Sequence, residues 1–112
     1  MLEKKAIVVI SQECNPEKEV EFNDWYFNVH IPMAMKYPGL IKATRCRMQT
    51  STNGQKGYLT IFEFKDQAAM AGFVKSPEVA LTLQEMNEKW QGKLPFEIKW
   101  RNEYEVMQTW EK

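Results

Sequence analysis

The chain has 112 residues, of which 44% are hydrophobic and 12% aromatic, with only five glycines and five prolines. This composition excludes disordered, collagen-like and low-complexity classes, and the length fits one domain over residues 1–112. Fifteen basic and fifteen acidic residues give a net charge of zero. Because a net positive field would be needed to attract nucleic acid or anionic lipid, we expect no nucleic-acid partner and no membrane partner.

Three further features limit the location and the chemistry of the chain. The apolar run at residues 6–10 is too short for a signal sequence or a membrane span, which predicts a cytoplasmic protein. Cys14 and Cys46 form no C-x-x-C motif, so we expect reduced thiols without a nucleophilic role. His30 is the only histidine. Sites that need two imidazoles, such as two-histidine zinc sites, are thereby excluded.

The first half of the chain predicts a strand, a helix and a hairpin. Residues 5–12 are β-branched and apolar on both faces, as in a central strand. Pro16 then opens a helix expected to reach about Ile31, where Pro32 should end or kink it. Residues 40–49 and 57–64 are expected to be two strands, since the polar loop between them contains the turn pair Asn53-Gly54.

A second helical region is expected over residues 67–90. Asp66 is in position to cap its start, and Ser76-Pro77 can end one helix and begin another. Gly92 and Pro95 should end the region, because glycine favours the left-handed turn after a helix and proline cannot continue it.

The last element is predicted to be a strand that is too long for a single subunit to cover. From Phe96 to Glu111 six of the eight even positions are apolar, against one of the eight odd positions. An unbroken strand of this length would span ~50 Å, whereas a compact chain of this size has a radius of gyration of only ~13 Å. Its far end, with Met107 and Trp110, should therefore bend at a bulge or pair with a neighbouring chain. We expect a symmetric homodimer.

The element order βαββαβ predicts an α+β fold. Such an order gives a ferredoxin-like sandwich, in which a four-stranded antiparallel sheet carries both helical regions on one face. The polar row Lys99, Arg101, Glu103 and Glu105 is expected to project in part from the uncovered face.

His30 lies within the apolar arc of the first predicted helix. At about 100° per residue, Tyr26 stands one turn before it and Asn23 two turns before it on the same side. One interpretation is a core or interface histidine satisfied by a backbone carbonyl. The other is a general acid or base at a pocket mouth, with Tyr26 and Asn23 holding the substrate. Burial lowers the pKa of His30, whereas the carbonyl end of the helix raises it. Because the two effects oppose each other, we expect His30 to titrate near neutrality.

The run Glu21 to Pro32 (EFNDWYFNVHIP), with Pro38-Gly39-Leu40 and Thr44-Arg45, resembles the EthD-like branch of the dimeric α/β-barrel superfamily. The resemblance implies a homodimer whose two sheets close into a barrel, with a ligand pocket between each sheet and its helices. It also implies proton transfer by a pocket histidine without metal or organic cofactor. His30 matches that histidine and Arg45 the strand-two arginine. The expected substrate-binding residues are Tyr26, Asn23, Trp25, Phe27 and Arg45.

These observations lead to one functional hypothesis and several alternatives. The hypothesis is a cofactor-independent isomerase, cyclase or lyase that moves a proton on a small, partly apolar carbonyl or phenolic metabolite through His30. The alternatives are a non-catalytic small-molecule-binding or accessory dimer, and a haem-handling monooxygenase with His30 as iron ligand. The same element order serves RNA-recognition domains. Thr60 and Glu63 stand where such domains need aromatic residues, so we do not expect RNA binding.

Overall fold

The computed structural model describes residues 4–54 and 57–112 and has the predicted βαββαβ order. The strands are β1 (Ala6–Cys14), β2 (Leu40–Arg47), β3 (Tyr58–Phe64) and β4 (Phe96–Glu105). The first helical region contains the 3₁₀ turn η1 (Pro16–Lys18), α1 (Glu19–Trp25), the π-helical turn η2 (Tyr26–His30) and α2 (Ile31–Ala34). The second contains α3 (Gln67–Phe73) and α4 (Pro77–Trp90).

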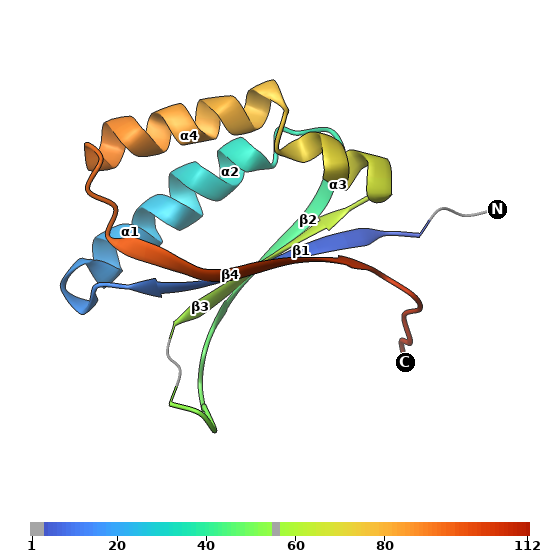
Figure 1. Ribbon diagram of the computed structural model, residues 1–112, viewed down its shortest axis with the longest axis horizontal. Coiled ribbons are helices and arrows are strands. Elements are labelled where there is room, and N and C mark those ends of the chain that lie inside the picture. The colour runs from blue at the N-terminus through green and yellow to red at the C-terminus, as the bar shows by residue number, and fades with distance from the viewer. Residues whose placement is uncertain (1–3, 55–56) are drawn as a thin grey trace.

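The four strands form one antiparallel sheet in the order β2-β3-β1-β4. All the helices lie on one face of this sheet, and within the described part of the chain nothing covers the other face (Figure 1). The predicted ferredoxin-like sandwich is thereby confirmed. The start of β1 and the end of β4 lie at the same end of the sheet (Figure 1).

Two hydrophobic clusters hold the helices on the sheet. The first joins β1 and β3 to α2 and α3, and it contains Ala6, Val8, Ala34, Leu40, Phe62, Phe64, Ala69, Met70 and Phe73. The second joins α1 and η2 to the end of α4 through Phe22, Trp25, Tyr26 and Trp90. The predicted caps form as well: Asp66 accepts a hydrogen bond from the Ala69 amide at 2.7 Å, and Ser76 from the Val79 amide at 3.2 Å.

The first helical region continues through Pro32 to Ala34, so of the two expected outcomes at this residue, an end or a kink, the end is wrong. The structure instead inserts the π-helical turn η2 directly before α2, and the Ile31 amide donates to the Tyr26 carbonyl five residues earlier. Proline lacks an amide hydrogen, and its ring clashes with the carbonyl four residues before it in a regular helix. A wider turn relieves both problems without ending the helix, and such turns occur often at functional sites.

A β-bulge divides the apolar row of β4 between the two faces of the sheet. The register shifts between Ser11 and Gln12 of β1, so that Ile98 stands opposite Gln12 and Trp100 opposite Ser11. Directly opposite residues share a face. Before the bulge the even residues therefore face the helices, and after it Trp100, Asn102 and Tyr104 face the uncovered side.

The structure narrows one expectation for the last strand and corrects another. Of the polar row only Lys99 is on the uncovered side, where it pairs with Glu13 at 3.1 Å and with Glu97 at 3.5 Å. Arg101, Glu103 and Glu105 stand opposite Ile10, Val8 and Ala6 and lie on the helix side of this edge strand. The strand also ends at Glu105 and not at Glu111. Residues 106–112 continue without regular structure, with Met107 and Trp110 82% and 80% exposed.

Two glycines shape the β2–β3 hairpin. Gly54 has a φ of 77°, as the predicted Asn53-Gly54 turn requires, although residues 55 and 56 of this loop lie outside the described residues. Gly57 has a φ of 124°, and any Cβ there would collide with the carbonyl oxygen of Gln12. Glycine at residue 57 therefore lets the hairpin approach the end of β1 closely.

Candidate functional site

Three adjacent strands project polar side chains toward the helices at one level of the sheet. Arg45 of β2 pairs with Thr60 of β3, and Gln12 of β1 lies diagonally beside Thr60. The Nη1 atom of Arg45 donates to Thr60 Oγ1 at 2.8 Å and to Gln12 Oε1. Gln12 and Thr60 are 3% and 0% exposed. The sheet thus holds a guanidinium group inside the molecule, where the first helix covers it.

Aromatic rings surround the guanidinium of Arg45. Its Cζ atom lies 4.0 Å from the centre of the Tyr26 ring, 4.5 Å from that of Tyr58 and 5.2 Å from that of Phe22. These cation–π contacts offset part of the cost of burying the charge. Within the described residues no carboxylate forms an ion pair with Arg45, and its Nε and Nη2 atoms are buried without a hydrogen-bond partner. Burial lowers the pKa of Arg45 from its usual value.

Tyr26 connects the Arg45 cluster to His30. Its hydroxyl shares a 2.7 Å hydrogen bond with Thr60 and accepts one from Gln12 Nε2 at 3.4 Å. Its ring centre lies 4.9 Å from the imidazole of His30, which is also 4.9 Å from the indole of Trp25. Contact with residues both four and five positions earlier fits the wide turn of η2. The helix therefore places the imidazole directly beside the buried polar cluster.

The imidazole of His30 is held in its neutral form. Its Nδ1 atom is buried and has no hydrogen-bond partner among the described residues. Burial, and secondarily the positive charge of Arg45, lower the pKa of His30 from 6.5 to about 4. The expectation of titration near neutrality is therefore wrong, because desolvation outweighs the carbonyl end of a helix that does not stop at this residue. At neutral pH the imidazole is uncharged, so one ring nitrogen carries a proton and the other can accept one.

A second group of polar contacts reaches from α1 to β3. Asn23 Nδ2 donates to the Tyr58 hydroxyl at 3.0 Å, while its Oδ1 atom is buried without a partner. The Tyr58 hydroxyl in turn donates to the carboxylate of Glu19. Burial, then the hydrogen bond to Glu19, raise the pKa of Tyr58. The phenol is therefore neutral, and its ring is fixed between Arg45 and the surface.

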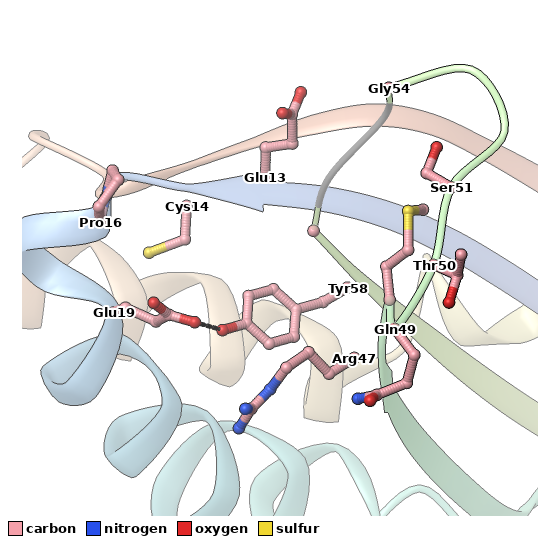
Figure 2. Close-up of a pocket in the computed structure, with 12 residues that line it drawn as sticks. Glu13, Cys14, Pro16, Glu19, Arg47, Gln49, Thr50, Ser51, Gly54 and Tyr58 are labelled. Atoms are coloured by element: carbon pink, nitrogen blue, oxygen red, sulfur yellow. Dashed lines mark hydrogen bonds between the residues drawn. The ribbon is translucent and has the colours of Figure 1, made fainter.

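A cavity of about 580 Å³ opens at the end of the sheet where β1 meets α1 and the β2–β3 hairpin. Figure 2 shows Tyr58 and Glu19 joined across this cavity, with the Cys14 thiol nearby. The remaining lining residues are Glu13, Pro16, Arg47, Met48, Gln49, Thr50, Ser51, Gly54 and Gly57. Tyr58 lines the cavity and also covers Arg45, so its ring separates the open space from the buried guanidinium.

The structure brings together five of the predicted site residues and separates one. Asn23, Tyr26, His30 and Arg45 lie around one buried cluster, although none of the four lines the cavity. Trp25 contacts the His30 ring at 4.9 Å from the other side, where it also packs against Trp90 and donates to Glu85 through Nε1. Phe27 is 54% exposed on the outer side of the helix.

Reasoning from the sequence did not assign Gln12, Thr60, Glu19 or Tyr58 to the site. A signal for two of them was present. Gln12 follows Val8 and Ile10 at every second position of β1, and Thr60 lies between Tyr58 and Phe62 in the same way on β3. A polar residue inside a row of inward-facing apolar residues needs a polar partner. The role of Glu19 depends on helix placement and has no comparable signal.

The described residues offer little for metal, haem or thiol chemistry. Residues 4–54 and 57–112 contain no group of three histidine, cysteine or acidic side chains that could hold a metal ion. The ring of His30 packs against Trp25 and Tyr26 and does not line the cavity, so a haem iron or a substrate in the cavity reaches it only if a side chain between them moves. Burial, then Glu19, raise the pKa of Cys14, which disfavours a reactive thiolate. No helix of these residues is long and apolar enough to cross a membrane.

Several solved structures share this fold at low sequence identity. An ethyl tert-butyl ether degradation (EthD) family protein from Bacillus halodurans is 22% identical, with a TM-score of 0.65 over 93% of this chain and 99% of that chain. HapK from Hahella chejuensis is 14% identical, with a TM-score of 0.71 over 96% and 97%. SnoaB, a cofactor-independent oxygenase from Streptomyces nogalater, is 15% identical, with a TM-score of 0.60 over 95% and 96%. The fold is therefore that of the EthD-like dimeric α/β-barrel proteins.

Two comparisons of the sequence complete this picture. A family model described as a domain of unknown function, DUF4286, matches residues 6–105. No curated protein matches the chain.

Proposed function

Because the chain belongs to the DUF4286 family, a domain of unknown function, we propose its activity from the site itself. The proposed activity is that of a cofactor-independent enzyme that moves a proton on a small, partly apolar carbonyl or phenolic metabolite. One observation carries the proposal: among the residues that the structure describes, no carboxylate pairs with the buried guanidinium of Arg45, which lies near the neutral imidazole of His30. A buried charge is normally paired, so an unpaired one suggests a group that stabilises negative charge on a ligand.

The chemistry divides between two side chains. The neutral imidazole of His30 takes a proton from the carbon next to a carbonyl, or from a phenol. The negative charge then develops on the substrate oxygen, where Arg45 stabilises it. Return of the proton from His30 to another atom of the substrate completes an isomerisation, a ring closure or an elimination. Asn23 Oδ1 can accept a hydrogen bond from the substrate, whereas the Tyr26 hydroxyl is already bonded to Thr60 and serves to position the helix.

We also propose that the protein is a homodimer closed through its uncovered sheet face. The accessible surface is 7947 Å², whereas a compact monomer of this mass exposes only ~6,400 Å². The excess of ~1,500 Å² exceeds the ~800 Å² that each partner buries in a standard interface. Trp100 and Tyr104 lie on this face, 38% and 45% exposed. A second copy of the sheet would cover them.

A second function, non-catalytic binding of a small molecule, is favoured by a different observation. The cavity is lined by Tyr58 and Glu19 and not by His30. In a binding protein His30 would remain packed and take no part when the ligand enters.

Hydrogen–deuterium exchange on small ketones and phenols in D₂O separates the two functions without knowledge of the substrate. The wild type is expected to accelerate exchange of acidic C–H positions in at least one class, and His30→Gln is expected to remove the acceleration while keeping the fold. Asn28→Ala is the matched control, because Asn28 lies on the same turn and bonds only to Asp24. Exchange at wild-type rate in His30→Gln would contradict the catalytic proposal.

A further inference from the structure

The two unpartnered atoms of Arg45 form a specific recognition edge. Nε and Nη2 are neighbouring donors along one edge of the planar guanidinium group, while Nη1 donates to Thr60 and Gln12. An edge with two parallel N–H groups matches the two oxygens of a carboxylate, which it binds with two hydrogen bonds. The protein fixes this edge through Nη1 and leaves the other side of the guanidinium unused.

The charges around the cavity also favour an anion. Arg47 lies two residues after Arg45 on the same face of β2 and lines the cavity, and among the described residues it forms no ion pair. The cavity carboxylate Glu13 is paired with Lys99 at 3.1 Å. Glu19 accepts the hydrogen bond from Tyr58. Two unpaired cations therefore face one partly engaged carboxylate at this end of the molecule.

Tyr58 is the barrier between the cavity and the recognition edge. Its ring covers the guanidinium of Arg45 at 4.5 Å. Its hydroxyl donates to Glu19 (Figure 2) and accepts a hydrogen bond from Asn23. Both holding contacts are to helix side chains, so the ring can turn about its side-chain bonds once they release. The backbone of β3 does not need to move.

We propose that the ligand of this cavity carries a carboxylate, which displaces the Tyr58 ring and binds the Nε–Nη2 edge of Arg45. This inference rests on the proposed ligand-binding function and adds the chemical class of the ligand. Tyr58 is a gating residue that exchanges a cation–π contact with Arg45 for a charge-assisted hydrogen-bond pair between Arg45 and the ligand. Such an exchange is favourable because the carboxylate supplies a negatively charged partner for the buried guanidinium cation.

Benzoate is a suitable probe, and benzamide is its neutral match in ring and size. The chain contains three arginines, Arg45, Arg47 and Arg101, so their Nε–H groups give three separate NMR signals. Benzoate is expected to shift the Arg45 signal most and to bind at least about tenfold more tightly than benzamide. This measurement uses the wild-type protein and does not depend on the folding of any variant. A shift confined to Arg47, or equal affinity for both probes, would overturn the proposal.

Variants test the same point. Arg45→Gln is expected to reduce the preference for benzoate to about twofold or less, while Arg101→Gln, which removes an exposed charge on β4, keeps it. Tyr58→Phe is expected to tighten benzoate binding several-fold, because the ring is no longer tied to Glu19. A Tyr58→Phe variant that binds no more tightly would show that the ring is not a gate and would overturn that part of the proposal.

The outcomes also separate this inference from the proposed function. His30→Gln is expected to bind benzoate like the wild type, since the carboxylate edge does not include His30. Proton exchange that depends on His30, found together with no preference for benzoate, would refute the carboxylate site and leave the catalytic proposal standing. Benzoate binding at Arg45 without any exchange activity would have the opposite meaning.

Discussion

The Cζ atom of Arg45 lies 4.0 Å from the centre of the Tyr26 ring, and Tyr26 in turn packs against His30 with ring centres 4.9 Å apart. One tyrosine thus separates a buried cation from a buried neutral imidazole. The arrangement explains why the pKa of His30 is low: burial and the nearby cation act in the same direction.

The first prediction concerns the dependence of stability on pH. The pKa of His30 is about 4 in the folded protein and 6.5 when unfolded, so the unfolded chain binds the extra proton first. The contribution of His30 is therefore fully present above pH 6.5 and is lost as the pH falls from 6.5 toward 4. The loss in unfolding free energy is about 3 kcal/mol at its largest, below the folded-state pKa.

Urea unfolding of wild type and His30→Gln between pH 7 and pH 5 measures this effect. Most carboxylates stay ionised over this interval, so the wild type should lose stability while His30→Gln stays nearly level. Parallel curves for the two proteins would show that His30 is not held neutral by burial.

A second prediction separates positioning from simple packing at Tyr26. Tyr26→Phe removes the buried hydrogen bond to Thr60 and should cost about 1–2 kcal/mol of unfolding free energy. Tyr37→Phe is a matched control, since Tyr37 donates a 2.7 Å hydrogen bond to the Ala69 carbonyl far from the site. Both variants should lose similar stability, but only Tyr26→Phe should weaken benzoate binding. Equal binding by both variants would argue against a positioning role for Tyr26.

Assembly is tested on the uncovered face of the sheet. Trp100→Asp should turn the expected dimer into a monomer in sedimentation experiments, because it places a charge where the second sheet is expected to pack. Val20→Asp is the control, since Val20 is 86% exposed on a helix and should leave the dimer unchanged. A wild type that sediments as a monomer at micromolar concentration would contradict the proposed barrel.

The hairpin gives a fourth prediction. Gly57→Ala should destabilise the protein by about 1–3 kcal/mol, because residue 57 has a positive φ and a Cβ would meet the Gln12 carbonyl. Gly54→Ala shares the positive φ but points into open space, so its cost should stay near ~1 kcal/mol. Thermal unfolding compares the two, and equal losses would mean that the contact with Gln12 does not matter.

Sequence patterns predicted the element order, the Asp66 and Ser76 caps and the grouping of Asn23, Tyr26 and His30, because all of these depend on local periodicity. Arg45 was predicted to belong to the same site because of the family resemblance. Two features were outside the reach of such patterns. The π-helical turn before Pro32 and the bulge in β4 each insert one residue, and one residue is enough to change which side chains share a face. The place of Glu19 and Tyr58 at the cavity depends on how the helix packs across the sheet, which periodicity does not specify.

The most direct test follows the imidazole of His30 by NMR, because the chain has a single histidine and its signals cannot be confused with others. In the free protein the pKa of His30 should be about 4. Saturation with benzoate should raise this pKa, since a carboxylate on Arg45 removes the repulsion that the cation exerts on a protonated ring. A pKa near 6.5 in the free protein, or one that stays unchanged while the Arg45 signal shifts, would contradict a shared site.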